Sequence, residues 1–281
     1  MKKNILFIAI ILAAMLIGYS SCKRDFSLTS PVKTTEGTSY LAIIDASPNF
    51  RRIYNLPDSF NVFINGQKIT GFTPGTVSPF MTFGATFPST TTGFGYVAVP
   101  PGLQQIKFSV SGKINPDSIA IATFNKTFLP DQQYTFMITD SIQSTRDSSQ
   151  IFLQDVYNFP PTIGYYNLRF IHAVLNDTLG KTVDLFSYAK NAVIYSNLKP
   201  GAVTAFSQIG VNLQVTDTLY VTRSLATGVS STTPLSSRLI LAKMSFQAGS
   251  QKSYTVYFRG DINLTATTNI KSRALSFYRH E

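Results

Sequence analysis

The sequence predicts an all-β protein built from two tandem sandwich modules. Three observations support this: short runs that alternate apolar and polar residues, turn-forming residues between those runs, and an internal repeat of their order. The 3.6-residue period of an amphipathic helix is absent from about residue 40 onward. Threonine, valine, tyrosine and phenylalanine, which suit a pleated and half-buried surface, are abundant in the same region.

Six segments have the alternation of strands: Phe60–Ile64, Gln105–Ser111, Tyr134–Ile138, Leu219–Thr222, Leu239–Phe246 and Tyr254–Phe258. The first of them ends at Asn65-Gly66, and both of these residues tolerate positive φ. This dipeptide is the strongest short-range signal for a two-residue hairpin turn. We therefore predict a hairpin at this position.

The chain then repeats itself. Four segments recur in the same order at offsets of 120 to 127 residues: Leu41–Ala46 with Leu168–Ala173, Phe60–Phe63 with Val183–Phe186, Phe72–Phe80 with Leu198–Phe206, and Gln133–Phe136 with Ser253–Val256. Four matches in the same order would hardly arise by chance, so the sequence predicts two homologous modules.

The boundary between the modules falls at Pro160 and Pro161, which have no backbone N–H to donate to a β-ladder. We assign module 1 to residues 39–157, a linker to 158–164 and module 2 to 165–281. Modules of about 115 residues with roughly seven to nine short strands favour an immunoglobulin-like sandwich over a closed barrel. The chain has no tryptophan and a single cysteine, so phenylalanine and tyrosine must fill the cores.

The N-terminal residues have the layout of a bacterial export signal. Two lysines precede the apolar run Ile5–Ile17, and small residues lead to Cys22, the one cysteine of the chain. This arrangement resembles the lipobox of bacterial lipoproteins, in which the cysteine receives acyl chains such as palmitate. An ordinary cleaved signal and an uncleaved anchor are the alternatives, but a run of about 13 residues is short against the roughly 20 that span a bilayer. We predict a signal peptide over 1–21 and a lipidated cysteine with a flexible tether over 22–38.

Lipid on Cys22 predicts a protein anchored in the outer membrane, because several acyl chains give a stable attachment. The charged residues that follow, Lys23, Arg24 and Asp25, resemble a surface-export signal of some Gram-negative bacteria. The sequence leaves open whether the protein lies on the cell surface or on the periplasmic face.

The formal net charge of +10 becomes +8 once the two lysines of the signal are removed. This excess reflects scarce acidic residues, since Glu36 and Glu281 are the only glutamates. Lysine and arginine form no cluster of the kind that binds nucleic acid, which excludes nucleic acid as an expected partner.

Four features of module 1 together resemble the bacterial domain-of-unknown-function family numbered 4397: Ile43–Asn49, the strand ending at Asn65-Gly66, Gly75 with Ser78 and Phe80, and Val99–Gly102. The resemblance covers residues 40–157 and, more weakly, 165–281, where Val174-Leu175 replaces Ser47-Pro48. It implies an extracytoplasmic, β-rich and often tandem protein, and it implies no catalytic residue.

Residues that could support catalysis or metal binding are few. A zinc site needs three or four His, Cys or carboxylate ligands, whereas the chain has only His172 and His280 besides Cys22. His172 occupies the repeat position of Asp45 inside a strand, which favours a structural histidine. The aspartates mark turns and strand ends, where they bond to nearby backbone. We expect no enzyme, no cofactor and no metal.

The pattern Asp, then Ser or Thr, then an aliphatic residue occurs four times, which places candidate O-glycosylation at Ser118, Ser141, Thr178 and Thr218. The alternative interpretation is that Asp followed by Ser or Thr begins strands after turns. If these residues are glycosylated, we expect them in exposed loops.

Aromatic residues near the module boundary and near the loop 84–95 are candidate ligand contacts: Tyr157, Tyr165, Tyr166, Phe94 and Tyr96. Core filling and packing between modules is the alternative. A partner should touch the loops 84–95 and 141–150, because sandwich loops carry function. The sequence thus predicts a non-enzymatic envelope lipoprotein acting in adhesion or assembly, with a glycan-binding protein that serves polysaccharide capture as the alternative.

Overall fold

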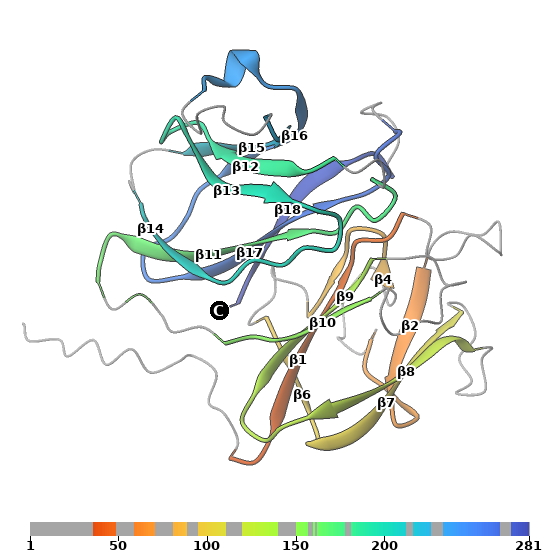
Figure 1. Cartoon of the computed structure of the whole chain (residues 1–281). Coiled ribbons are helices and arrows are strands. Elements are labelled where there is room, and N and C mark those ends of the chain that lie inside the picture. The colour runs from red at the N-terminus through yellow and green to blue at the C-terminus, as the bar shows by residue number, and fades with distance from the viewer. Residues whose placement is uncertain are drawn as a thin grey trace, which may run out of the picture. The chain divides into compact units, whose positions relative to one another are not determined.

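The computed structural model describes residues 36–48, 59–70, 81–88, 95–110, 120–139, 150–156, 160, 162–177, 181–211, 216–225, 233–264 and 271–280. Within these ranges the chain forms mainly β-strands, with one short 3₁₀ helix at Leu235–Ser237 (Figure 1). The all-β architecture of two sandwich modules is therefore confirmed. In the same ranges, no helix has the length and apolar character needed to cross a membrane.

Module 1 consists of two sheets around one apolar core. The β1 sheet has the order β10-β9-β1-β5 with β6 also paired to β1, and the β2 sheet has the order β3-β2-β7-β8 with β4 also paired to β2. Their bounds are β1 Ser39–Asp45, β2 Ser59–Ile64, β3 Gln67–Lys68, β4 Met81–Thr82, β5 Thr86–Phe87, β6 Val97–Val99, β7 Gly102–Val110, β8 Ala120–Phe128, β9 Gln133–Ile138 and β10 Ile151–Gln154. Leu41, Phe60, Phe108 and Phe136 are fully buried in the core between the sheets.

Module 2 repeats this arrangement. Its β11 sheet has the order β14-β11-β17-β18, and its β12 sheet has the order β13-β12-β15-β16. The bounds are β11 Tyr165–His172, β12 Val183–Ser187, β13 Ala192–Leu198, β14 Ser207–Gly210, β15 Asp217–Arg223, β16 Ile240–Phe246, β17 Ser253–Arg259 and β18 Ala274–Arg279. Leu168, Phe170, Leu185 and Val256 are fully buried in its core.

The two modules share both topology and register. In each, the first strand runs parallel to the penultimate strand, which then pairs antiparallel with the last one. Leu41 lies opposite Tyr134, and Leu168 lies opposite Tyr254. These are the residues that the sequence repeat aligns, so the same pairing is built twice.

A tyrosine hydroxyl also closes the same turn in both modules. The hydroxyl of Tyr134 accepts a hydrogen bond from the Leu129 amide at 2.9 Å, and that of Tyr254 accepts one from the Gly249 amide at 2.8 Å. Each ring packs edge-on against the phenylalanine that ends the preceding strand, at centroid distances of 5.0 and 5.2 Å. The two turns differ in length, but the anchor is the same.

The predicted hairpin is confirmed. Asn65 and Gly66 have φ of 46° and 81°, and Ile64 pairs with Gln67 across them. Both central residues therefore adopt the left-handed conformation that a two-residue turn of this kind requires.

All six predicted strands are present, with shifts at their ends. Several predictions fall outside the described residues and stay predictions: the signal peptide, Cys22, the tether up to residue 35, Ser118, Ser141, Thr178, Tyr157 and Phe94.

Candidate functional site

The two modules meet through the outward faces of the β1 and β11 sheets. Every residue of β1 is buried, as is every residue of β11 after Tyr165. One face of each strand packs in its own module's core, so a different surface must cover the other face. Contacts across the boundary between Arg169 and Asp155 and between Tyr96 and His280, described below, show that each module covers the other.

A buried ion pair lies at this junction. Asp155 follows β10 in module 1, and its Oδ1 lies 2.7 Å from Nη2 of Arg169, which projects from β11 in module 2. The side chains are 0% and 4% exposed, respectively. Asp155 Oδ2 also accepts hydrogen bonds from the Thr135 hydroxyl at 2.6 Å and the Tyr96 hydroxyl at 3.0 Å. The carboxylate is thus ion-paired through Oδ1 and hydrogen-bonded through Oδ2.

The hydrogen bonds continue into a closed ring. Arg169 Nε donates to the Thr255 hydroxyl at 3.0 Å, and that hydroxyl lies 2.7 Å from Nε2 of His280. His280 Nδ1 contacts the Tyr96 hydroxyl, which donates to Asp155. We call Tyr96, Thr135, Asp155, Arg169, Thr255 and His280 the junction cluster.

The ring has one consistent direction of donation. If Tyr96 donates to Asp155, it must accept from His280 Nδ1, so that nitrogen carries the proton. His280 Nε2 is then an acceptor for Thr255, whose oxygen in turn accepts from Arg169. The arrangement fits the neutral Nδ1–H tautomer of His280.

The electrostatics agree with this assignment. Burial, and secondarily the Arg169 charge, lower the pKa of His280 well below its usual 6.5. Burial raises the pKa of the Asp155 carboxyl, while the Arg169 guanidinium and the Thr135 and Tyr96 hydroxyls oppose that shift. An isolated carboxylate could not remain charged at such a site, so Arg169 is the group that stabilises it.

Aromatic rings and a glycine complete the junction. The Arg169 guanidinium lies 4.6 Å from the centroid of Phe206, which is in turn 5.4 Å from the His280 ring. A Cβ at Gly95 would lie 2.8 Å from the backbone oxygen of Arg279 and would also overlap Tyr278. Position 95 therefore requires glycine for module 1 to approach β18 this closely.

A second contact between the modules involves Arg259 at the end of β17. Its guanidinium lies 4.6 Å from the ring centroid of Phe83 in module 1, and its Nε donates to the Ser276 hydroxyl at 2.8 Å. The junction therefore has two anchoring arginines.

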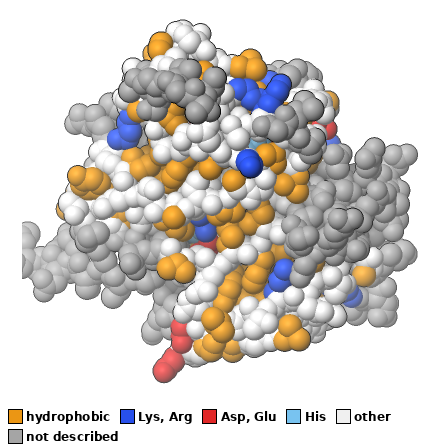
Figure 2. All heavy atoms as spheres, in the orientation of Figure 1, with side chains coloured by type: hydrophobic (Ala, Val, Ile, Leu, Met, Phe, Trp, Pro, Cys, Tyr) orange, Lys and Arg blue, Asp and Glu red, His pale blue; other side chains and the backbone are white. Residues whose placement is uncertain are grey.

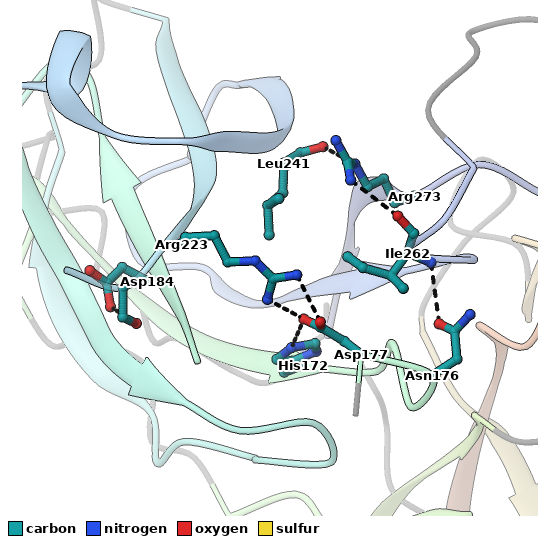
Figure 3. A network of polar contacts seen from close by, with 9 residues as sticks. His172, Asn176, Asp177, Asp184, Arg223, Leu241, Ile262 and Arg273 are labelled. Atoms are coloured by element: carbon teal, nitrogen blue, oxygen red, sulfur yellow. Dashed lines mark hydrogen bonds and ion pairs between the residues drawn. The ribbon is translucent and has the colours of Figure 1, made fainter. Parts of the chain in front are cut away.

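A separate polar network ties together the strands of module 2 (Figure 3). Arg223 binds both carboxylate oxygens of Asp177, at 2.6 and 2.7 Å, and Nε2 of His172 lies 3.4 Å from the same carboxylate. Burial lowers the pKa of His172 to about 4 although Asp177 opposes this shift. Beside it, Arg273 donates to the backbone oxygens of Leu241 at 2.9 Å and Ile262 at 3.1 Å.

The described members of the predicted ligand-contacting set, Tyr96, Tyr165 and Tyr166, differ in exposure. Tyr96 belongs to the junction cluster and is 8% exposed, whereas Tyr166 is 3% exposed and packs in the core of module 2. Tyr165 is 41% exposed. Among the described members of the predicted set, two therefore have the packing roles that were the alternative interpretation.

Thr218 is not in a loop. It lies in β15 opposite Ser245 of β16, and its carbonyl oxygen accepts a hydrogen bond from Tyr188. The preceding Asp217 accepts hydrogen bonds from the Ser187 hydroxyl and the Ala189 amide, so it holds the turn after β12. At this site the structure matches the interpretation in which Asp and Thr begin a strand.

Sequence reasoning missed Asp155, Arg169 and His280 as a site. The available signal was the run Tyr40–Ile44, which is apolar on both faces and therefore typical of a strand buried on both sides. Among the described residues, no three His, Cys, Asp or Glu side chains are grouped so as to hold a metal ion.

Comparison with known proteins adds no family. No protein-family model matches the chain. A search of the curated proteins finds no match either.

Proposed function

We propose that this protein is a non-enzymatic lipoprotein of the cell envelope, anchored in the outer membrane through Cys22, that acts in adhesion or in assembly with other envelope components. The resemblance to the family numbered 4397 is part of this proposal, as are the signal peptide and the tether. The observation that carries it is the junction cluster.

A buried ion pair within a closed hydrogen-bond ring supports a rigid connection between the two modules. Loosely linked domains usually share small polar interfaces, and relative motion is then expected. Here both arginine anchors come from module 2 and reach residues of module 1. A rigid two-module body on a flexible tether is suited to holding a partner at a fixed distance from a membrane.

The alternative is capture of a glycan. Sugar binding would favour several exposed aromatic rings in one cleft, but Tyr96 and Tyr166 are buried in different surroundings. This distribution supports the adhesion or assembly role over glycan capture.

The test compares the wild type with Cys22→Ser in intact cells. We expect the wild type to fractionate with the outer membrane, to carry acyl chains by mass spectrometry of its N-terminal peptide, and to be digested by added protease. Cys22→Ser should lose both the acyl chains and the membrane association. A wild type without acyl chains would contradict the anchor. A wild type that is membrane-bound and fully protected from protease would contradict surface adhesion and place its partners on the inner side.

A further inference from the structure

Module 1 has a cavity beside its β2–β3 hairpin. It has a volume of about 710 Å³ and lies between the β2–β3 hairpin and β6. This volume is within the range of about 300–1,000 Å³ typical of small-molecule pockets. The β6 side is also where the chain enters the module, because Ser39 at the start of β1 pairs with Val99.

The lining is mostly aliphatic. It consists of Phe63, Ile64, Ile69, Val97, Ala98, Val99 and Pro100, with Asn65, Gly66, Gln67, Lys68 and Gln104 also contributing. Figure 2 shows hydrophobic side chains gathered over the β1–β6 part of module 1 with few charged side chains among them. A ligand in this pocket would therefore contact mainly aliphatic groups.

The polar side chains of the pocket lining differ in whether they already have bonding partners. The Asn65 and Gln104 amides bond to each other, Asn65 Oδ1 also accepts from the Gln105 amide, and Gln104 Nε2 donates to the Pro101 oxygen. Lys68, in contrast, takes part in none of the ion pairs among the described residues. The pocket thus combines an apolar wall with one cation that forms no ion pair within the part of the chain that the structure describes.

The repeat supplies an internal comparison. Module 2 has a pocket at the corresponding end, lined by the turn residues Ala189 and Lys190, the end of β14, and Asp217, but its volume is only about 240 Å³. There Tyr166 and Phe246 form part of the wall. The register places Ser39 of module 1 at the position of Tyr166, so a small residue stands where module 2 has a large ring.

From these observations we propose that module 1 binds a single-chain amphiphile, with its aliphatic chain between β3 and β6 and its anionic head at Lys68. The lining suits an alkyl chain better than a sugar, because few of its side chains offer hydrogen bonds that are not already made. A fatty acid and a lysophospholipid share this chemistry. The proposal does not depend on lipidation of Cys22 or on the adhesion role.

The test uses the chain from residue 22 with Cys22→Ser, purified without detergent. Binding of the fluorescent fatty acid cis-parinaric acid is titrated, and dodecanoate, dodecyl phosphate, dodecanol and maltohexaose are then added as competitors. We expect one saturable site from which both anionic amphiphiles displace the probe, and maltohexaose should not compete. A stronger effect of the phosphate would indicate a phospholipid source, and a stronger effect of dodecanoate would indicate a free fatty acid.

Three variants locate the site. Val97→Trp should weaken binding by about tenfold or more because the ring occupies the pocket. Ser207→Trp, at the same register position of module 2 and outside both pockets, should leave affinity unchanged. Lys68→Gln should weaken dodecanoate by roughly tenfold, the value of a charged hydrogen bond, and leave dodecanol unaffected.

Circular dichroism confirms that each variant is folded before binding is measured, and Lys68→Gln tests the head contact without altering the apolar wall. The proposal is overturned if the wild type shows no saturable binding, or if maltohexaose competes as well as dodecanoate. It is also overturned if the two tryptophan variants behave alike.

Discussion

Replacing Arg169 by methionine tests the junction cluster most sharply. The change removes the guanidinium but retains a flexible apolar chain that can still pack near Phe206. It leaves the Asp155 carboxylate, which is 0% exposed, with two neutral hydroxyl donors and no counter-charge. Breaking a buried pair by removing one partner costs about 3–5 kcal/mol.

We therefore expect Arg169→Met to lower the free energy of unfolding by about 3–5 kcal/mol. For a chain of this size, that corresponds to a fall in Tm of roughly 6–20 °C. Urea denaturation followed by circular dichroism gives the first quantity, and calorimetry gives the second. Calorimetry should also show the two modules unfolding in separate transitions in the variant.

A second arginine of module 2 provides the matched control. Arg238 lies 2.9 Å from Asp184 in an ion pair that is equally buried, and its guanidinium is 5.4 Å from the centroid of Phe186. Arg238→Met should destabilise module 2 by a similar amount without separating the modules. The difference between the two variants isolates the connection from the general effect of an unpaired buried charge.

The double variant Asp155→Asn/Arg169→Met should recover about half or more of the loss, because it removes the buried charge but keeps an acceptor oxygen for Tyr96 and Thr135. The reasoning is refuted if Arg169→Met costs less than about 1 kcal/mol, the value of an exposed pair. It is equally refuted if the double variant is no more stable than the single one.

Three further predictions concern separate parts of the fold. Burial lowers the pKa of His172 from 6.5 to about 4, so the folded state favours the neutral imidazole. The stability that depends on this neutral form is fully present above pH 6.5 and is lost as the pH falls toward 4, with a total loss of about 3 kcal/mol. Urea denaturation across this range measures the loss, and His172→Gln should make the free energy of unfolding less dependent on pH. Tyr134→Phe and Tyr254→Phe should each lower the free energy of unfolding by about 1–3 kcal/mol, because each removes the hydroxyl that accepts a hydrogen bond from the backbone amide five residues earlier. Clearly different losses for the two variants would contradict the view that the two tyrosines have equivalent roles. Gly95→Ala should make the two modules unfold in separate calorimetric transitions, because the new Cβ would clash with the backbone of β18. Gly66→Ala is the control: no atom lies within 4 Å of its Cβ, so the substitution should lower the free energy of unfolding by only about 1 kcal/mol, through its positive φ.

The strands that the sequence predicted are those with a consistent environment on each face. Tyr254–Phe258, for example, has its aromatic and β-branched residues in the core or in the junction. Strands at sheet edges, such as β10, β13, β14 and β18, were missed because their exposure is mixed and leaves no period of two.

The junction could not be derived from alternation alone. Pairing Asp155 with Arg169 depends on how two modules pack, and neither residue lies in a motif with a fixed spacing. Tyr96 was a candidate ligand contact because it follows a loop, but its hydroxyl bridges Asp155 and His280. The pairing of strands within each module can be predicted from local sequence patterns. The contact between the modules depends on how the two folded sandwiches pack together.

The central claim, that the two modules form one rigid body, is tested most directly by a distance between spin labels. In a Cys22→Ser background, cysteines replace Leu103 of module 1 and Leu239 of module 2, which are 68% and 65% exposed. Double electron–electron resonance should give a single narrow distance distribution that broadens when Arg169→Met is added. A broad distribution in the background protein, unchanged by Arg169→Met, would show that the junction does not hold the modules together.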